Sequence, residues 1–559
     1  MRYRTLSPAL PLPSFFSSLA FLFTLLVLLP VQPIRAQTPP PPDNCTNLLV
    51  TKGASQDGSV MITYTCDGEF HSHLERTPAA EHEAGSFVEG IAGGEIRQVP
   101  HTYAVVGYIN ENQVAIGETT FGGRRELTNR EGLLSYPALM QLALERSGSA
   151  REAIQVMTDL VAEYGYRSSG ESFSIGDKEE AWILEMIGPG PGGEGAEWVA
   201  VRIPDGEISA HANKARIGTF PLDDPENCLY SENVISFAVE NGYYDPESGE
   251  PFSFCEAYCP ATPTDLRATE TRVWSLFRRA APSLNLSPDY HRGVAGADRY
   301  PLSVKPDEKL SVADVFALMR DHYEGTEFDM TQGVDAGPFG NPFRVRPLGW
   351  EVDGVQYSWE RPISTQQTAF SFVSQSRARL PDGVGGVMWY SPDDTNYACY
   401  VPFYSSIDAL PVSYTVGSLQ EFSWEDAWWV FNFVSNYSNL MYSYMIQDVR
   451  AVQSELEGDL LARQAAVENT AAELAETNPD EMVRYLTQYS VSQAEEVVRR
   501  WRDLGESLIV KYNDGYVQER PGRPSEVGYP QGWLDTVARE RGDDLRLRQP
   551  EETEEELPY

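Results

Sequence analysis

The chain has 559 residues, with 43 lysines and arginines against 82 aspartates and glutamates, so its formal net charge is −39. A protein this acidic repels nucleic-acid phosphates, which excludes a general DNA- or RNA-binding function. Hydrophobic residues make up 42% of the chain and aromatic residues 11%, enough to bury a large core, which excludes an intrinsically disordered acidic protein. Six cysteines are too few for a disulfide scaffold, although Cys255 and Cys259 are close enough in sequence to pair.

Residues 1–36 have the pattern of a secretory signal peptide. Arg2 and Arg4 precede an apolar run centred on residues 19–29, and Ala36 marks a cleavage site. The run is shorter than the roughly 20 residues that span a bilayer, and an uncleaved membrane anchor is the alternative interpretation. No later stretch is apolar enough to span a bilayer. We therefore expect a secreted or periplasmic protein with no membrane span in its mature form.

Residues 37–44 form a short spacer with four consecutive prolines. Such a run cannot form a helix or an interior strand, so it predicts a stiff connection that ends directly at Cys45. A lipoprotein signal would place the cysteine immediately after the apolar core. Here the core ends well before Cys45, which argues against lipidation.

Residues 45–424 show strand patterns, then helix patterns, then strand patterns again. Helices are predicted at 136–145, 150–164 and 311–323, and Ser149 with Glu152 forms a capping box for the second helix. Strands are predicted at 48–51, 60–65, 103–108, 113–117, 172–175, 181–186, 198–203, 207–210, 355–359, 368–372, 386–390 and 397–401. This order is typical of a layered α+β domain rather than of alternating βαβ units.

Residues 425–513 are predicted to be a helical extension. Apolar residues recur there at helical spacing, and the dipeptide Asn478-Pro479 marks the break between two long helices. We expect the apolar stripe to pack against the main body. Residues 514–559 are predicted to form an acidic C-terminal tail.

Two motifs suggest cofactors, but their context argues against both. Residues 188–195 contain a GxGxxG pattern, yet they lie between two predicted strands and include two prolines, so they predict a hairpin loop. His71, His73 and His82 match no common metal-ligand spacing. We therefore expect neither a cofactor nor a metal.

Cys45 is the strongest candidate for a catalytic residue. A papain-like pair with His211 is disfavoured because the local signature of that family is absent around Cys45. If the bond before Cys45 is cut, its thiol lies beside its own α-amine, whose pKa of about 7.7–8.0 suits a base near neutral pH. Asp67 can hold that amine, and Asn213 can donate its amide to the oxyanion.

Several long segments carry a resemblance to a known family. They are CTNLLVTKGASQDGS from Cys45, GETTFGG from Gly117, SGESFSI from Ser169, WILEMIG from Trp182, SAHANKARI from Ser209, MRDHYEGT from Met319 and RPISTQQTAFSFV from Arg361. Over roughly 400 residues the chain resembles the secernin-related cysteine dipeptidases, a branch of the N-terminal nucleophile hydrolases. The resemblance implies a four-layer αββα sandwich over 45–424 and hydrolysis of dipeptides without a metal.

The resemblance also implies roles for individual residues. Cys45 matches the nucleophile, and Asn213 matches a structural asparagine. Asp67 falls where the related bile-salt and penicillin-V acylases place their catalytic aspartate. The arginine of those acylases falls on Tyr64, which favours a dipeptidase.

Substrate contacts are expected at two further places. The oxyanion-hole position lies near Glu118 and Thr119. Arg361 matches a later arginine of the family, and it can orient the nucleophile, pair with a substrate carboxylate, or form a structural ion pair.

The function expected from sequence is a secreted or periplasmic cysteine dipeptidase activated by removal of residues 1–44. It acts on small peptides, and a homo-oligomer is compatible with the sequence. One alternative is an N-acyl amide acylase on the same fold. Another is a catalytically silent secreted binding protein.

Overall fold

The computed structural model describes residues 45–88, 94–520 and 522–547. The expected signal peptide and the spacer before Cys45 lie outside the described residues, as does the acidic end of the predicted tail. None of the helices in these described ranges is long and apolar enough to cross a membrane.

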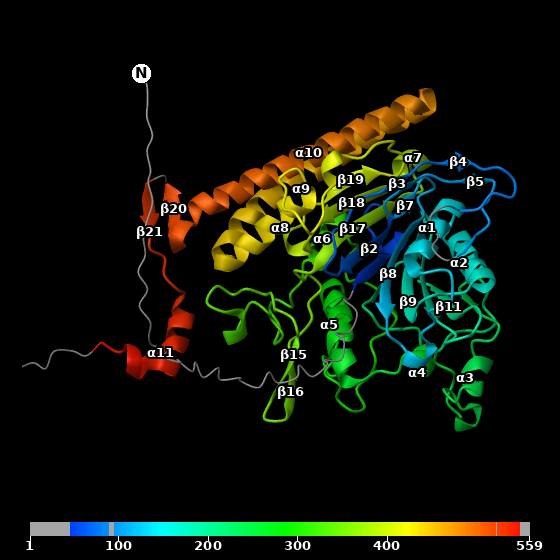
Figure 1. Ribbon diagram of the computed structural model, residues 1–559, viewed down its shortest axis with the longest axis horizontal. Coiled ribbons are helices and arrows are strands. Elements are labelled where there is room, and N and C mark those ends of the chain that lie inside the picture. The colour runs from blue at the N-terminus through cyan, green and yellow to red at the C-terminus, as the bar shows by residue number, and fades with distance from the viewer. Residues whose placement is uncertain (1–44, 89–93, 521, 548–559) are drawn as a thin grey trace, which may run out of the picture. The chain divides into compact units, whose positions relative to one another are not determined.

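Two large antiparallel sheets form the centre of the structure (Figure 1). In the first, the strands lie in the order β14 (Ser303–Val304), β12 (Ile208–His211), β1 (Asn47–Val50), β2 (Val60–Asp67), β17 (Thr368–Ser376), β18 (Val387–Pro392) and β19 (Val401–Tyr404). In the second, the order is β13 (Cys228–Tyr230), β11 (Glu197–Arg202), β10 (Ala181–Ile187), β9 (Gly170–Gly176), β8 (Ala115–Phe121), β7 (Ile109–Asn110), β6 (Val105–Val106) and β3 (Arg76–Thr77). The structure is therefore a mixed fold built on antiparallel sheets.

The smaller elements lie in the connections and at the C-terminal end. Three two-stranded sheets pair β4 (Ala80–Glu81) with β5 (His101–Thr102), β15 (Gly349–Val352) with β16 (Val355–Ser358), and β20 (Val517–Arg520) with β21 (Arg523–Ser525). Three short helices, α3 (Ser236–Glu240), α4 (Phe254–Tyr258) and α7 (Asp382–Gly385), lie in the connections, and α11 (Gln531–Leu545) lies near the C-terminal end. Residues 514–547 of the predicted tail thus contain two strands and a helix, and α11 has no buried residue.

The two large sheets pack against each other through buried side chains. Every residue of β1, β2, β9 and β10 is buried, as expected for strands covered on both faces. Gly117 on β8 marks the closest approach. A Cβ there would lie 2.8 Å from Asn47 Nδ2 and 3.1 Å from Tyr64 Cβ, so glycine lets the sheets meet at this point. This contact brings the start of β1 next to the middle of β8.

Helices pack on the outer sides of the two sheets. Helices α1 (Tyr136–Arg146) and α2 (Ala150–Tyr164) contact β8, β9 and β10. Helices α5 (Pro263–Ala280) and α6 (Val312–Met319) contact β12 and β17 respectively. The N-cap predicted for α2 is present, because Ser149 Oγ accepts a hydrogen bond from the Glu152 backbone N–H at 3.2 Å. The predicted capping box is incomplete, since the Glu152 carboxylate accepts from the Gly148 backbone N–H rather than from that of Ser149.

The predicted helical extension consists of α8 (Ala427–Ser438), α9 (Tyr442–Thr477) and α10 (Pro479–Lys511). The predicted break is confirmed, since Asn478 caps α10 and Pro479 is its first residue. Helices α9 and α10 lie against β19, and their buried residues belong to the same core as β17 and β18 (Figure 1). The boundary at residue 424 stays a prediction.

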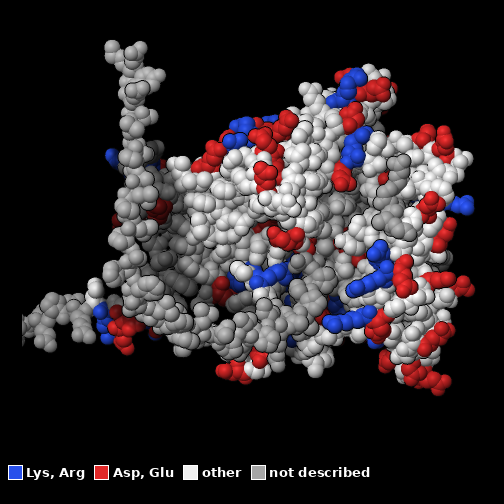
Figure 2. All heavy atoms as spheres, viewed as in Figure 1, with Lys and Arg blue, Asp and Glu red and all other residues white. Residues whose placement is uncertain are grey.

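The outer surface of α10 carries alternating charges. Arg499 pairs with Glu496 and Asp503, one turn away on either side, at 2.6 and 2.8 Å. In Figure 2, basic and acidic side chains lie next to each other along the upper edge of the visible face, where Figure 1 shows this helix. Such exposed pairs contribute little to stability because water screens them, so contacts on the buried side of α10 hold the helix in place. There Trp501 stacks on Phe431 of α8, with ring centroids 5.1 Å apart.

A buried ion pair joins α9 to the first sheet. Arg377, just after β17, pairs with Glu468 at 2.5 Å, and both side chains are almost fully buried. Replacing Glu468 with alanine leaves a guanidinium buried without its carboxylate. We expect E468A to lower the free energy of unfolding by about 3 kcal/mol. E455A, which removes the more exposed Glu455–Arg500 pair, should change it by less than about 1 kcal/mol. Urea unfolding measures both, and equal effects would show that the buried pair does not hold the extension in place.

Candidate active site

Cys45 lies two residues before β1, and a buried arginine holds its backbone. Arg272 Nη1 on α5 donates to the Cys45 carbonyl at 2.7 Å and to Thr46 Oγ1 at 2.9 Å. Its Nη2 donates to the Ala212 carbonyl and to Asn213 Oδ1, both at 3.1 Å. One guanidinium therefore links the start of β1 to the end of β12. Burial and the nearby Arg361 charge lower the pKa of Arg272 to about 9.

The thiol of Cys45 faces a carboxylic acid on the opposite sheet. Its Sγ lies 3.5 Å from Glu118 Oε1 on β8, and the Tyr64 hydroxyl donates to the same oxygen at 2.6 Å. Hydrogen bonding to Cys66, burial and the charge of Glu118 raise the pKa of the Cys45 thiol well above its usual value. These effects favour the protonated form of the thiol.

Glu118 is itself paired with a second buried carboxyl group, that of Glu171 on β9. Strand register places the two on the same face of the second sheet, because Glu118 lies opposite Phe173 and Thr120 lies opposite Glu171. The two carboxyls are close enough to share a hydrogen bond. Burial and the neighbouring charge of Glu118 raise the pKa of Glu171 well above its usual value.

Asp67 lies at the end of β2 and is held by three side chains. Arg361 Nη2 forms a buried ion pair with Asp67 Oδ2. Thr368 Oγ1 donates to Oδ1 at 2.6 Å, and the hydroxyl of Thr65 contacts Oδ2 at 3.4 Å. Thr65 Oγ1 also accepts the backbone N–H of Thr46 at 2.9 Å. Asp67 is thus connected to the residue after Cys45 through one hydroxyl group.

Asn213 follows β12 with a left-handed backbone, at φ 63°. Its Nδ2 donates to the Thr120 carbonyl at 2.7 Å, while its Oδ1 accepts from Arg272. Both Asn213 and Thr120 are half-buried, whereas Cys45 and Glu118 are buried. The Asn213–Thr120 contact therefore lies at the more accessible edge of the cluster.

Thr119 and His211 form a separate contact between the sheets. His211 Nδ1 lies 2.7 Å from Thr119 Oγ1, and its Nε2 lies 2.7 Å from Ser174 Oγ. Both ring nitrogens are thus engaged with hydroxyls, and no hydrogen bond joins His211 to Cys45 among the described residues. Burial and the Arg216 charge lower the pKa of His211 to about 3, so the ring is neutral. This arrangement does not support a papain-like pair with His211. A substrate contact by Thr119 stays a prediction.

Arg272 and Glu171 are the residues that the sequence prediction missed. Helix α5 was not predicted, although Thr262 and Asp265 form a full capping box around Pro263 at its first position. That signal was available in the sequence. The location of Arg272 beside Cys45 was not, because the two residues are 227 positions apart.

The other predicted chemical groups lie outside this cluster. His71 pairs with Asp426 at 2.7 Å, and no group of potential metal ligands occurs in the part of the chain that the structure describes. Cys255 and Cys259 are both free thiols, so the disulfide considered from their spacing is not formed. Residues 188–195 form the loop between β10 and β11, as predicted.

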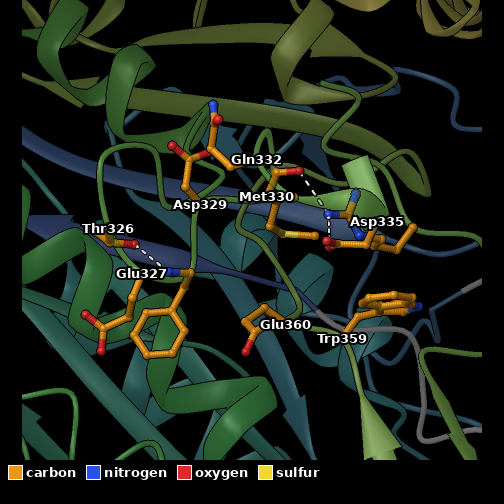
Figure 3. Close-up of a pocket in the computed structure, with 11 residues that line it drawn as sticks. Thr326, Glu327, Asp329, Met330, Gln332, Asp335, Trp359 and Glu360 are labelled. Atoms are coloured by element: carbon orange, nitrogen blue, oxygen red, sulfur yellow. Dashed lines mark hydrogen bonds and ion pairs between the residues drawn. The ribbon is translucent and has the colours of Figure 1, made fainter. Parts of the chain in front are cut away.

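A cavity of about 280 Å³ lies beside the loop that leads to Arg361 (Figure 3). Trp359 and Glu360 form part of its wall, immediately before Arg361. Arg344 forms another part of the cavity wall and pairs with Asp335 at 2.5 Å. Its remaining lining residues are Thr326, Glu327, Phe328, Asp329, Met330, Gln332 and Gly333. The charged residues of the wall are mainly acidic, and its arginine is already paired, which makes the cavity a poor place for a peptide carboxylate.

Comparison with known sequences places the protein among the peptidases. The pattern of peptidase family C69 matches residues 71–455, and the chain belongs to that family. Glu118, Glu171, Asn213, Arg272 and Arg361 lie inside the matched segment. Cys45 and Asp67 precede it.

Characterised relatives carry consistent names. A probable dipeptidase of Salmonella dublin is 28% identical over 389 residues, which cover 65% of this chain and 81% of that protein. A probable dipeptidase of Latilactobacillus sakei is 28% identical over 66% of this chain and 76% of its own length. A dipeptidase of Bifidobacterium longum is 26% identical over 66% of this chain and 72% of its own length.

The buried His211 predicts a specific loss of stability in acid. In the unfolded chain its imidazole binds a proton below about pH 6.5, whereas the folded protein takes it up only near pH 3. Stability therefore falls as the pH drops through this window, by up to about 1.4 kcal/mol per unit. In H211Q this contribution is absent, so the stability advantage of the wild type over H211Q should shrink steadily from pH 6.5 towards pH 4.

Urea unfolding at half-unit pH steps measures this difference. H101Q removes an exposed histidine and serves as the control. Parallel stability curves for wild type and H211Q would show that the ring is charged in the folded protein.

Proposed function

We propose that this protein is a dipeptidase with the αββα sandwich of the N-terminal nucleophile hydrolases, and that Cys45 is its nucleophile. The observation that supports Cys45 as the nucleophile is its position in the fold. It lies two residues before β1, its carbonyl is held by Arg272 on α5, and its thiol faces Glu118 on the second sheet. Membership of family C69 and the names of the relatives support the dipeptidase activity.

Removal of residues 1–44 activates the site in this proposal. Cutting the bond before Cys45 creates an α-amine next to the thiol, and this amine accepts the thiol proton. The thiolate then attacks the peptide carbonyl carbon, and the carbonyl oxygen becomes an oxyanion. Asn213, at the accessible edge, is the candidate donor to that oxyanion.

Collapse of the tetrahedral intermediate breaks the C–N bond. The proton held by the α-amine passes to the leaving amine, and the first amino acid stays on Cys45 as a thioester. A water molecule, deprotonated by the same amine, then attacks the thioester and releases that amino acid. The thiol regains its proton, so the cycle consumes only the dipeptide and water.

Asp67 and Arg361 have a positioning role in this proposal. The Asp67 carboxylate is held by Arg361 and Thr368, and its link through Thr65 reaches the backbone beside Cys45. Arg361 is buried and already paired with Asp67, so orienting the nucleophile suits it better than anchoring a substrate carboxylate.

The signal-peptide pattern of residues 1–36 supports action outside the cytoplasm, in the periplasm or medium.

The first test concerns processing and the nucleophile. Active enzyme should begin at Cys45 in N-terminal mass spectrometry, and C45A should lose at least about 10³-fold in kcat/KM for dipeptides. C228A, which changes another buried cysteine on β13, should retain activity. A stable, active form beginning at Gln37 would falsify the mechanism, and so would an active C45A.

The second test separates the dipeptidase from an acylase. Tyr64 occupies the position of the acylase arginine, and its hydroxyl is engaged with Glu118. We expect dipeptides to be preferred over penicillin V and conjugated bile salts by at least about 100-fold in kcat/KM. Faster turnover of the acyl amides would identify an acylase, and no turnover of either class would favour a binding protein.

A further inference from the structure

The region around the Cys45 thiol has an excess of buried acidic groups. Glu118 and Glu171 are both fully buried. No lysine, arginine or histidine forms an ion pair with either carboxyl among the described residues. Their hydrogen-bond donors are neutral hydroxyl and thiol groups, from Tyr64, Thr120, Ser168 and Cys45. Buried carboxylates normally have a cationic partner, so this pair lacks a positive charge.

One atom of the pair also lacks a donor. Glu171 Oε2 is buried and receives no hydrogen bond from any other hydroxyl, amide or basic group in the described chain. The Glu118 carboxyl lies next to the Glu171 carboxyl, and a hydrogen bond between two carboxyl groups requires a proton that they share. A donor that carries positive charge would satisfy both groups at once.

The distance to the nucleophile identifies where such a donor would come from. In a dipeptide the α-nitrogen lies about 2.5 Å from the carbon of the scissile carbonyl, two bonds away. That carbon must approach the attacking sulfur to about 3–3.5 Å. The α-ammonium is therefore within about 6 Å of Cys45 Sγ. Glu118 Oε1 lies 3.5 Å from the same sulfur. This carboxyl oxygen is therefore within hydrogen-bond reach of an ammonium group in that position.

We propose that Glu118, supported by Glu171, binds the free α-ammonium group of the dipeptide substrate, and this assignment rests on the proposed function. The half-buried Thr120, whose hydroxyl contacts Glu118 Oε2 at 3.4 Å, lies at the edge through which the amino end enters. The pocket is thereby specific for peptides with an unblocked N-terminus. N-acylated peptides bring no positive charge and leave the acidic pair uncompensated.

The same contact couples substrate binding to activation of the nucleophile. Without substrate, the charge of Glu118 opposes ionisation of the thiol. An ammonium bound to Glu118 cancels that charge and favours the thiolate, whose proton goes to the Cys45 α-amine. The substrate thus promotes its own attack, and the thiol stays protonated while the site is empty.

The experiment compares the best substrate of a dipeptide panel with its des-amino counterpart, in which hydrogen replaces the ammonium. Processed wild-type enzyme should prefer the dipeptide by about 100-fold or more in kcat/KM. E118Q should lower kcat/KM for the dipeptide by about 100-fold and change that for the des-amino compound by less than about threefold. E171Q should act in the same direction with a smaller effect.

The control variant is E197Q, which changes a buried carboxyl on β11 whose hydrogen-bond donor in the described chain is Ser231; its kinetics should match the wild type. Thermal unfolding verifies that each variant is folded. If E118Q does not fold, the assignment is decided by the wild-type ratio of kcat/KM for the two compounds and by the kinetics of E171Q.

Three outcomes overturn the assignment. If wild type cleaves both compounds equally well, the ammonium is not recognised, although the dipeptidase function stands. If E118Q lowers both rates equally, Glu118 acts on the α-amine of Cys45 rather than on the substrate. If wild type cleaves neither compound and C45A behaves identically, the proposed function itself fails and the assignment fails with it.

Discussion

The buried guanidinium of Arg272 is the interaction on which the arrangement around Cys45 depends. It replaces the water that the Cys45 and Ala212 carbonyls would otherwise need, and it fixes Asn213 at the same time. A buried arginine is costly to desolvate, and its five donors recover that cost only when they are matched by acceptors. Because its acceptors come from two strand ends and from α5 itself, the guanidinium holds β1, β12 and α5 in a single relative position.

Cys45 lies between two regions of opposite charge. Arg272 holds its backbone carbonyl and lies near the Arg361–Asp67 pair, whereas Glu118, next to Glu171, faces its thiol. No ion pair joins Arg272 to either glutamate among the described residues. A charged molecule that enters the site therefore changes the ionisation of the thiol.

Local signals in the sequence predicted the local structure well, and non-local contacts explain what was missed. The N-cap at Ser149, the break at Asn478 and the strands predicted at 172–175 and 181–186 depend on residues close together in the chain, and all are confirmed. The strand predicted at 397–401 begins instead at Val401, after a short turn closed by the Asp394 side chain.

The proximity of Cys45, Glu118, Glu171 and Arg272 depends on how two sheets and a helix pack, which no spacing reveals. The resemblance supplied Cys45, Asp67, Asn213 and Arg361, but it did not supply Glu171 or Arg272.

The charge distribution of the site suits a short zwitterion under the proposed function. A dipeptide carries its ammonium and its carboxylate at opposite ends, with the scissile bond between them. Glu118 lies on the thiol side of Cys45, while Arg272 lies on the side of its backbone carbonyl and bonds in the described chain only to uncharged groups. A carboxylate on that side gains from the field of the guanidinium without having to contact it.

A longer peptide would place its carboxylate farther from this field while its ammonium stayed at Glu118, so it would lose the second attraction. The overall acidity of the chain also favours a zwitterionic dipeptide as the substrate. A protein surrounded by negative charge repels anionic peptides, whereas a dipeptide zwitterion has no net charge and is not repelled in this way.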